Sequence, residues 1–392
     1  MQPFRSRMVA RDLGEPHRVS SPLELLFDLT FVAAVSQVAG RLAHTVEEGH
    51  AGDGLQPFLM VFFAIWWAWM NFTWFASAYE TDDVLYRVMT FVQMAGVLLL
   101  AAGVSAAFGG DFTTVTFGYL VMRVGLVGMW VRAAIEHPDG RQTALRYAVG
   151  VSIVQVFWVS RLALPGGGPT WLFFVLALMD VSVPLIAERP GMTTWHPHHI
   201  AERYGLFTII LLGESVLAAT NAVQDAVEHG LSGELVTIAM AGLAILFTLW
   251  WIYFSEPAGE LLAENREWSF VWGYGHYVVF AALAALGAGL EVAVVSAGPH
   301  IPAGDRTVVA AVAMPLAVVL VMLAVLHAPL GRQAVRPELI VGTAVLALLA
   351  TFTAPAVGVA GTLVVIAVLL ALLLAAILTR GPSSASRESQ PA

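Results

Sequence analysis

Two carboxylates one helical turn apart lie inside the first strongly apolar stretch of the chain. Residues 21–40 read SPLELLFDLTFVAAVSQVAG, and Glu24 and Asp28 are the two acids in it. Side chains four residues apart share one face of a helix, so both carboxylates would point the same way. Carboxylates in an apolar setting can bind a cation, exchange a proton or pair with a base. The spacing therefore predicts polar chemistry on one face of a hydrophobic helix.

The two acids have different expected roles. Ser21, Pro22 and Glu24 match a capping box, in which the glutamate reaches back to a free amide at the helix start. Asp28 lies about 9 Å along the helix from Pro22, at ~1.5 Å per residue, which is beyond the reach of capping. We expect Glu24 to cap the helix, and Asp28 to have a buried partner or a functional role. The basic residues that could pair with Asp28 are Arg18, Arg203 and His276.

A third acid, Glu214, lies deep in a later apolar segment, YGLFTIILLGESVLAATNA. It is about 20 Å from the start of its helix, which is near the middle of a membrane. Arg203 precedes it by eleven residues, or three helical turns, so the two side chains share a face without touching. This face could line a polar path; the alternative is a protonated or hydrogen-bonded glutamate that only holds helices together. The adjacent Gly213 predicts a close approach by another helix.

Arg123 and Asp180 are both expected near the middle of apolar segments. Placing either charge alone at the centre of a bilayer costs roughly 2.5–3.5 kcal/mol on insertion scales. The simplest interpretation is a structural ion pair between them. Coupling of transport to the breaking of this pair is the alternative.

The histidines suggest two further sites. His276 is expected about 12 Å inside its helix, either as a neutral, hydrogen-bonded side chain or as a proton relay. The stretch WHPHHIAER places His196, His198 and His199 close to Glu202. These residue types bind transition metals, but no cysteine or second ligand cluster accompanies them. We therefore expect a capped helix start here rather than a metal site, and no cofactor.

The tryptophans concentrate in two of the apolar segments. Trp66, Trp67 and Trp69 lie too deep in theirs to belong to an interfacial aromatic belt. Packing is the expected explanation for them, and lining a pathway is the alternative.

The composition is that of a membrane protein. Of 392 residues, 58% are hydrophobic and 12% charged, against about 25% charged in soluble domains. There is no cysteine, which excludes disulfides and iron–sulfur clusters, and no lysine. The net charge of −9 and the absence of a basic patch argue against a nucleic-acid partner. A Walker A motif, HExxH and G-x-S-x-G are also absent, so we expect no enzyme of those classes.

Twelve segments have the length and hydropathy of membrane-spanning helices, which need roughly 20 apolar residues. They are 22–43, 56–77, 86–107, 112–133, 143–163, 170–188, 200–222, 234–255, 268–296, 307–328, 337–355 and 359–379. With the N-terminus inside, fifteen of the 19 arginines fall in inside segments. Only Arg161 and Arg306 fall clearly outside, with Arg41 at the outer end of the first span. Since cytoplasmic loops collect arginine, we expect a multi-pass protein of the cell membrane with both termini cytoplasmic.

The two halves of the chain resemble each other. Glu24 and the following FDLTF align with Glu202 and GLFTI, and Trp66-Trp67 with Trp250-Trp251. We therefore predict an N-terminal tail (1–21), two parallel six-helix repeats (22–190 and 191–380) and a disordered tail (381–392). The fold class is all-α. Chance similarity between apolar segments is the alternative.

Two long motifs resemble one known family. SPLELLFDLTFVAAVSQVA in the first segment and HIAERYGLFTIILLGESVLAA in the seventh are similar to the bacterial low temperature requirement protein A family. The resemblance implies an integral membrane protein connected with growth at low temperature, without an established biochemical activity. It marks the family's characteristic positions as Glu24, Asp28, Glu202, Arg203, Gly205, Gly213 and Glu214.

These observations support three functional hypotheses. The first is a transporter or channel for a small cation or a proton-coupled solute. In this hypothesis Asp28 and Glu214 carry the ion or proton. Arg203 adjusts these acids electrostatically, and His276 is a possible proton relay. The second is a membrane-embedded enzyme acting on a lipid or isoprenoid-linked substrate, and the third is a non-catalytic scaffold for cold adaptation. The expected partners are the lipid bilayer and a small ion or small-molecule substrate, with further copies of the chain left open.

Overall fold

The computed structural model describes residues 4–12, 15, 18–229, 232–298, 301–327 and 337–380. Within these ranges all regular structure is helical, and eleven helices are long and apolar enough to cross a membrane. The predicted all-α membrane bundle is therefore confirmed. The predicted disordered tail, 381–392, lies outside the described residues.

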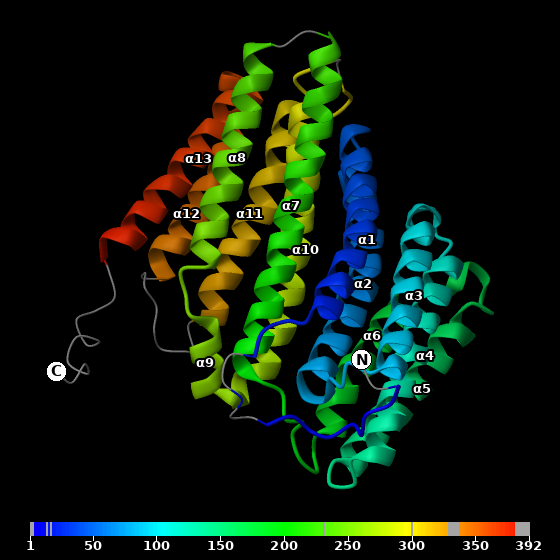
Figure 1. Ribbon diagram of the computed structural model, residues 1–392. Coiled ribbons are helices and arrows are strands. Elements are labelled where there is room, and N and C mark those ends of the chain that lie inside the picture. Colours follow the sequence, from blue (N-terminus) through cyan, green and yellow to red (C-terminus); the bar gives the residue numbers. More distant parts are fainter. Residues whose placement is uncertain are drawn as a thin grey trace, which may run out of the picture. The chain divides into compact units, whose positions relative to one another are not determined.

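The first of two compact units comprises Met1–Arg41 and Gly54–Phe207. In it, long helices run side by side, with α3 packed on α4, α4 on α5 and α5 on α6 (Figure 1). Its elements, wholly or in part, are α1 (Pro22–Glu47), α2 (Ala51–Tyr79), α3 (Val84–Phe108), α4 (Thr113–Glu136), α5 (Arg141–Arg161), η1 (Pro165–Gly167), α6 (Thr170–Ala187) and the start of α7 (Pro197–His229).

Glycines bring α3 and α4 into very close contact. A Cβ added to Gly96 would lie 2.7 Å from the carbonyl oxygen of Gly118, and one added to Gly118 would lie 2.7 Å from that of Gly96. No side chain fits between backbones at this distance. The pair is an example of the small-residue contacts by which membrane helices pack.

The N-terminal segment is tied to the first unit rather than hanging free. The amide of Ser6 donates to Asp83 at 2.7 Å, and the amide of Met8 donates to Glu136 at 2.6 Å. Arg132 of α4 binds Asp83 through two nitrogens, at 2.8 and 2.5 Å. The predicted N-terminal tail is thus anchored at the end of α4 and at the loop between α2 and α3.

The second unit comprises Leu42–Asp53 and Thr208–Ala392. Within it α10 packs on α11, α8 on α13, and α11 on both α12 and α13. Beyond the later part of α7, its elements are α8 (Gly233–Tyr253), α9 (Ala258–Glu264), η2 (Arg266–Trp268), α10 (Ser269–Val295), α11 (Asp305–His327), α12 (Pro337–Ala350), η4 (Thr351–Thr353) and α13 (Ala354–Arg380).

The predicted and observed spans differ in number only at the C-terminal end. The sequence suggests two spans separated at Pro355 and Gly358. Residues 337–379 are helical throughout, but they consist of two helices, α12 and α13, which are joined by η4 and pack on each other. Pro355 is tolerated because it lies in the first turn of α13. The backbone does leave helical geometry at Gly358, where φ is 74°, a value that glycine adopts at little cost. The predicted division is therefore present as the η4 turn between α12 and α13, together with the break at Gly358 in the first turns of α13.

The division between the compact units falls within α7, whereas the predicted repeats meet at residue 190. The duplication itself stays a prediction. One of its aligned pairs differs in environment, because Trp66 and Trp67 are buried while Trp250 and Trp251 are exposed.

Candidate functional site

Arg203, near the start of α7, joins the two acids of α1 in one buried cluster. Its Nη2 and Nε donate to Asp28 at 2.5 and 3.0 Å, and its Nη1 donates to Glu24 at 2.8 Å. None of the three side chains is more than 2% exposed. The planar guanidinium fits a carboxylate through two parallel bonds. Among the three basic residues considered from the sequence, Arg203 is therefore the partner of Asp28.

Asp28 has a second donor in the indole of Trp69, on α2. Trp69 Nε1 donates to Asp28 Oδ1 at 2.7 Å. Aromatic rings surround this contact: Phe27 lies 3.9 Å from Phe72, and Trp69 lies 4.4 Å from Phe207, between ring centroids. Such walls exclude water, so the charge of Asp28 depends strongly on the donors that face it.

The two carboxylate oxygens of Glu24 serve different purposes. Oε2 accepts from the amide of Ser21 at 2.9 Å, and the Ser21 hydroxyl accepts from the amide of Glu24 at 3.4 Å, as in the predicted capping box. Oε1 faces Arg203 and lies 3.0 Å from His199 Nε2. Glu24 thus both caps α1 and belongs to the buried cluster.

Further charges connect this cluster to Arg11 in the N-terminal segment. Arg18 Nη2 lies 3.9 Å from Glu24, and Arg18 Nη1 lies 3.2 Å from Glu80. Arg11 Nη1 lies 3.3 Å from the same Glu80 oxygen. The side-chain exposure falls from 25% at Arg11 through 2% at Arg18 to 0% at Arg203. We call this series the charge ladder: Arg11, Glu80, Arg18, Glu24, Arg203 and Asp28.

Glu80, between α2 and α3, is a step of the charge ladder that can hold a proton. Burial and the nearby Glu24 carboxylate raise the pKa of Glu80, against the opposing effects of Ser21, Arg18 and Arg11. Its side chain is only 8% exposed. A carboxyl group of this kind binds a proton at higher pH than a solvated glutamate does.

The histidine-rich stretch forms the start of α7. His196 Nδ1 accepts from the amide of His199 at 3.4 Å, and the amide of His196 donates to Ser77 at 3.0 Å. Glu202 accepts from the amide of Ser20, at 3.2 and 3.3 Å. His198 contacts the ring of His196, with the centroids 5.7 Å apart. Over the described part of the chain, no three histidine or acidic side chains gather as metal ligands.

Arg123 and Asp180 lie in a second buried polar cluster of the first unit, with Arg123 Nη2 3.7 Å from Asp180. Tyr119 mediates the pair: its hydroxyl donates to Asp180 at 2.9 Å and accepts from Arg123. Trp158 Nε1 also donates to Asp180, at 2.8 Å. The carboxylate is thus held mainly by neutral donors, with the arginine at its edge.

The remaining predicted site residues belong to the second unit. Glu214 is half-buried and forms no hydrogen bond or ion pair with any described residue. The predicted close helix approach at Gly213 is wrong, because a Cβ there would meet no described atom within 4 Å and the residue is exposed. His276 is buried, with Nδ1 2.8 Å from the Trp272 carbonyl and Nε2 3.2 Å from the Tyr253 hydroxyl. Because a carbonyl only accepts, a neutral ring satisfies both contacts.

Sequence reasoning missed two members of the first-unit site. Glu80 lies in YETDD, which is typical of a loop that faces water, and nothing in its spacing points to Arg18. The deep position of Trp69 in an apolar segment indicated that this residue is not part of an interfacial belt. That position alone could not predict that its indole binds Asp28.

These features define a class: the chain is a polytopic helical membrane protein with a buried ionic site in its first unit. The sequence profile of the bacterial low temperature requirement A protein family matches residues 19–378, and the chain belongs to that family. It is also similar to an uncharacterised protein of Rhizobium meliloti (strain 1021). The two are 25% identical over 277 residues, which is 66% of each chain.

Proposed function

We propose that this protein moves protons, or a small cation or solute coupled to them, across the cell membrane, with the charge ladder as part of the path. The observation that carries the proposal is the continuous series of charges from the half-buried Arg11 to the buried Arg203 and Asp28. Ionisable groups inside a membrane protein mark ion and proton pathways by default. In the orientation favoured by the arginine distribution, the ladder would open to the cytoplasm.

The ladder suggests how protonation of one carboxylate could change the ion-pair partner of an arginine. Three arginines face three carboxylates, so the series is balanced when all six groups are ionised. A proton arriving on Asp28 would remove the charge that holds two nitrogens of Arg203. The guanidinium would then depend on Glu24, which it already contacts. Such a change of partner is a two-state element that transport could use.

Glu214 and His276 are proposed for the part of the path in the second unit. Glu214 is half-buried and forms no hydrogen bond or ion pair with any described residue, and an intramembrane acid of this kind is a candidate site on an ion pathway. Glu291 of α10 is near enough to interact electrostatically with it. His276 is hydrogen-bonded to the Tyr253 hydroxyl and the Trp272 carbonyl, so it would have to exchange one of these hydrogen bonds before it could relay a proton.

Flux measurements in proteoliposomes test the proposal. Purified protein is reconstituted with a pH-sensitive dye inside, and gradients of protons, sodium or potassium are applied. We expect proton or cation movement above that of empty liposomes, and its loss in Asp28→Asn. Asp180→Asn is the matched control, a buried aspartate of the same unit outside the ladder. No flux under any gradient, or equal flux in both variants, would refute the role of the ladder.

A further inference from the structure

Arg161, the last residue of α5, is a buried cation without an acidic partner. It is 4% exposed, and its Nε has no hydrogen-bond partner. Of the carboxylates in the described ranges, none forms an ion pair with it. Other deeply buried arginines of this unit, such as Arg132 and Arg203, do have carboxylate partners. An unpaired buried charge is costly, so a negative group bound at this position would be stabilised by Arg161.

The surroundings compensate this charge only in part. The carbonyl groups at the end of α5 favour a cation at that position. The rings of Phe112 and Phe173 lie 5.4 and 5.9 Å from the guanidinium carbon, within the range of cation–π attraction. Neither contact accepts the hydrogen of Nε.

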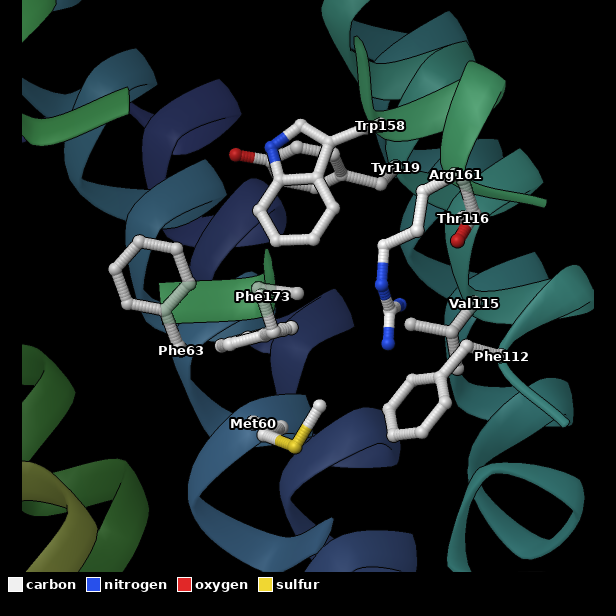
Figure 2. A pocket seen from close by; sticks show the side chains of 10 residues that line it. Met60, Phe63, Phe112, Val115, Thr116, Tyr119, Trp158, Arg161 and Phe173 are labelled. Carbon is white, nitrogen blue, oxygen red and sulfur yellow. The ribbon is translucent and has the colours of Figure 1, made fainter. Parts of the chain in front are cut away.

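The guanidinium points into a pocket among four helices of the first unit. Figure 2 shows it directed between Phe112, Val115 and Phe173, with Met60 and Phe63 on the opposite side. The pocket is a small, partly open hollow rather than an enclosed cavity. Apart from Arg161, its walls are mostly apolar and aromatic side chains of α2, α4 and α6.

A loop of three glycines lies against the same arginine. Gly166, Gly167 and Gly168 have φ angles of 60°, 70° and 75°, which residues with a Cβ rarely adopt. A Cβ added to Gly167 would lie 3.6 Å from the guanidinium carbon of Arg161. The loop therefore brings bare backbone over the cation and adds no side-chain acceptor to it.

We infer that this pocket binds an anionic membrane phospholipid, with its phosphate on Arg161 and hydrocarbon against the aromatic walls. A guanidinium matches a phosphate in shape and charge and can bind it through two parallel hydrogen bonds. The position of the pocket along the helices agrees with a phospholipid ligand. The pocket lies where α5 ends, at Arg161, and where α4 and α6 begin, at Thr113 and Thr170. Ends of membrane spans lie at the depth of lipid head groups. A soluble anion would not need the apolar walls.

Lipid binding to purified, delipidated protein tests the inference. The probes are dioleoyl phosphatidylglycerol, dioleoyl phosphatidylcholine with the same chains but no net charge, and inorganic phosphate. Bound lipid is counted by native mass spectrometry, and stabilisation is followed by the thermal unfolding midpoint. We expect phosphatidylglycerol to bind and stabilise more than phosphatidylcholine. Arg161→Gln should lose about ten- to hundredfold in affinity for it.

Two variants make the result specific. Arg146→Gln removes a more exposed arginine from the same helix and should bind phosphatidylglycerol as the wild type does. Ala64→Phe fills the apolar part of the pocket and should weaken lipid binding while Arg161 is intact. Equal binding by Arg161→Gln and the wild type, or no preference for the anionic lipid, would overturn the inference. Stabilisation by inorganic phosphate equal to that by phosphatidylglycerol would also overturn it, in favour of a soluble anion.

Discussion

Arg203 binds Asp28 through two nitrogens, at 2.5 and 3.0 Å, although 175 residues separate them in the chain. The same guanidinium reaches Glu24, so a single side chain of α7 compensates both acids of α1. The site is therefore assembled from two distant segments, and its energetics and proposed transport role can be tested separately.

Removal of Arg203 should be strongly destabilising. Arg203→Gln would leave Glu24 and Asp28 buried without their main counter-charge, at a cost of about 3–5 kcal/mol in the free energy of unfolding. Asp28→Asn in the same chain should recover part of this loss, because it removes one uncompensated charge. Equilibrium unfolding in mixed micelles of the two single variants and the double variant measures the coupling.

The control for this cycle is the exposed pair Arg87 and Asp82. Their nitrogen and oxygen lie 2.8 Å apart, with side chains 37% and 41% exposed. Exposed ion pairs contribute about 0–1 kcal/mol. A coupling in the buried pair no larger than in this one would contradict the expected energetic role of Arg203.

The indole of Trp69 should matter for transport more than for packing. Trp69→Phe keeps an aromatic ring but removes the donor to Asp28 Oδ1. We expect proteoliposome flux to fall severalfold, since the ionised carboxylate loses a charge-assisted hydrogen bond of about 1.5–3 kcal/mol. Trp74→Phe is the matched variant on α2, where the lost bond leads to the Tyr204 hydroxyl at 3.1 Å. Similar flux in the two variants would argue against a special role for the Asp28 contact.

The anchor of the N-terminal segment should depend on pH through Asp83. Burial raises the pKa of Asp83, but hydrogen bonds from Arg132 and from the amides of Ser6 and Tyr86 outweigh it and hold the pKa at about 2. An unfolded aspartate has a pKa of about 3.9. The folded-state value is thus depressed, so this stabilisation is present above about pH 4 and is lost as the pH falls towards 2.

Thermal unfolding midpoints of the wild type and Asp83→Asn, measured from pH 6 to pH 2, check this dependence. The difference between the two proteins should be largest above pH 4 and should shrink as the pH approaches 2. Asp82→Asn, in the neighbouring exposed ion pair, should differ little from the wild type at any pH. A gap between the wild type and Asp83→Asn that stays constant with pH would contradict the prediction.

The contact between α3 and α4 should not accept a methyl group. In Gly118→Ala the added Cβ would overlap the backbone of Leu100 and lie 2.7 Å from the Gly96 carbonyl oxygen, so the helices must separate. We expect a loss of about 1–3 kcal/mol in stability. Gly40→Ala is the counterpart, since a Cβ there meets no described atom within 4 Å, and it should be neutral or stabilising. An unfolding midpoint for Gly118→Ala that equals or exceeds that of Gly40→Ala would refute this account.

Much of the fold can be predicted from the sequence because a bilayer imposes simple rules. Every spanning segment must satisfy its own backbone hydrogen bonds, so length and hydropathy suffice to find the helices. The capping box at Ser21 and Glu24 is equally local and needs no tertiary information. The C-terminal stretch is harder, since Gly358 can begin a loop or bend a helix with the same residues.

The sequence by itself determined that this protein is a helical membrane bundle, that Asp28 lies beyond the reach of helix capping, and that Arg203 was one of three residues able to pair with it. Only the tertiary structure decided the pairing, because the bond joins α1 to α7 and depends on how those helices pack. It also decided the partners that carry no periodic signal, such as Trp69, Glu80 and the unpaired Arg161. Periodicity describes one helix face at a time, whereas a buried charge is stabilised by whatever a neighbouring helix places opposite it.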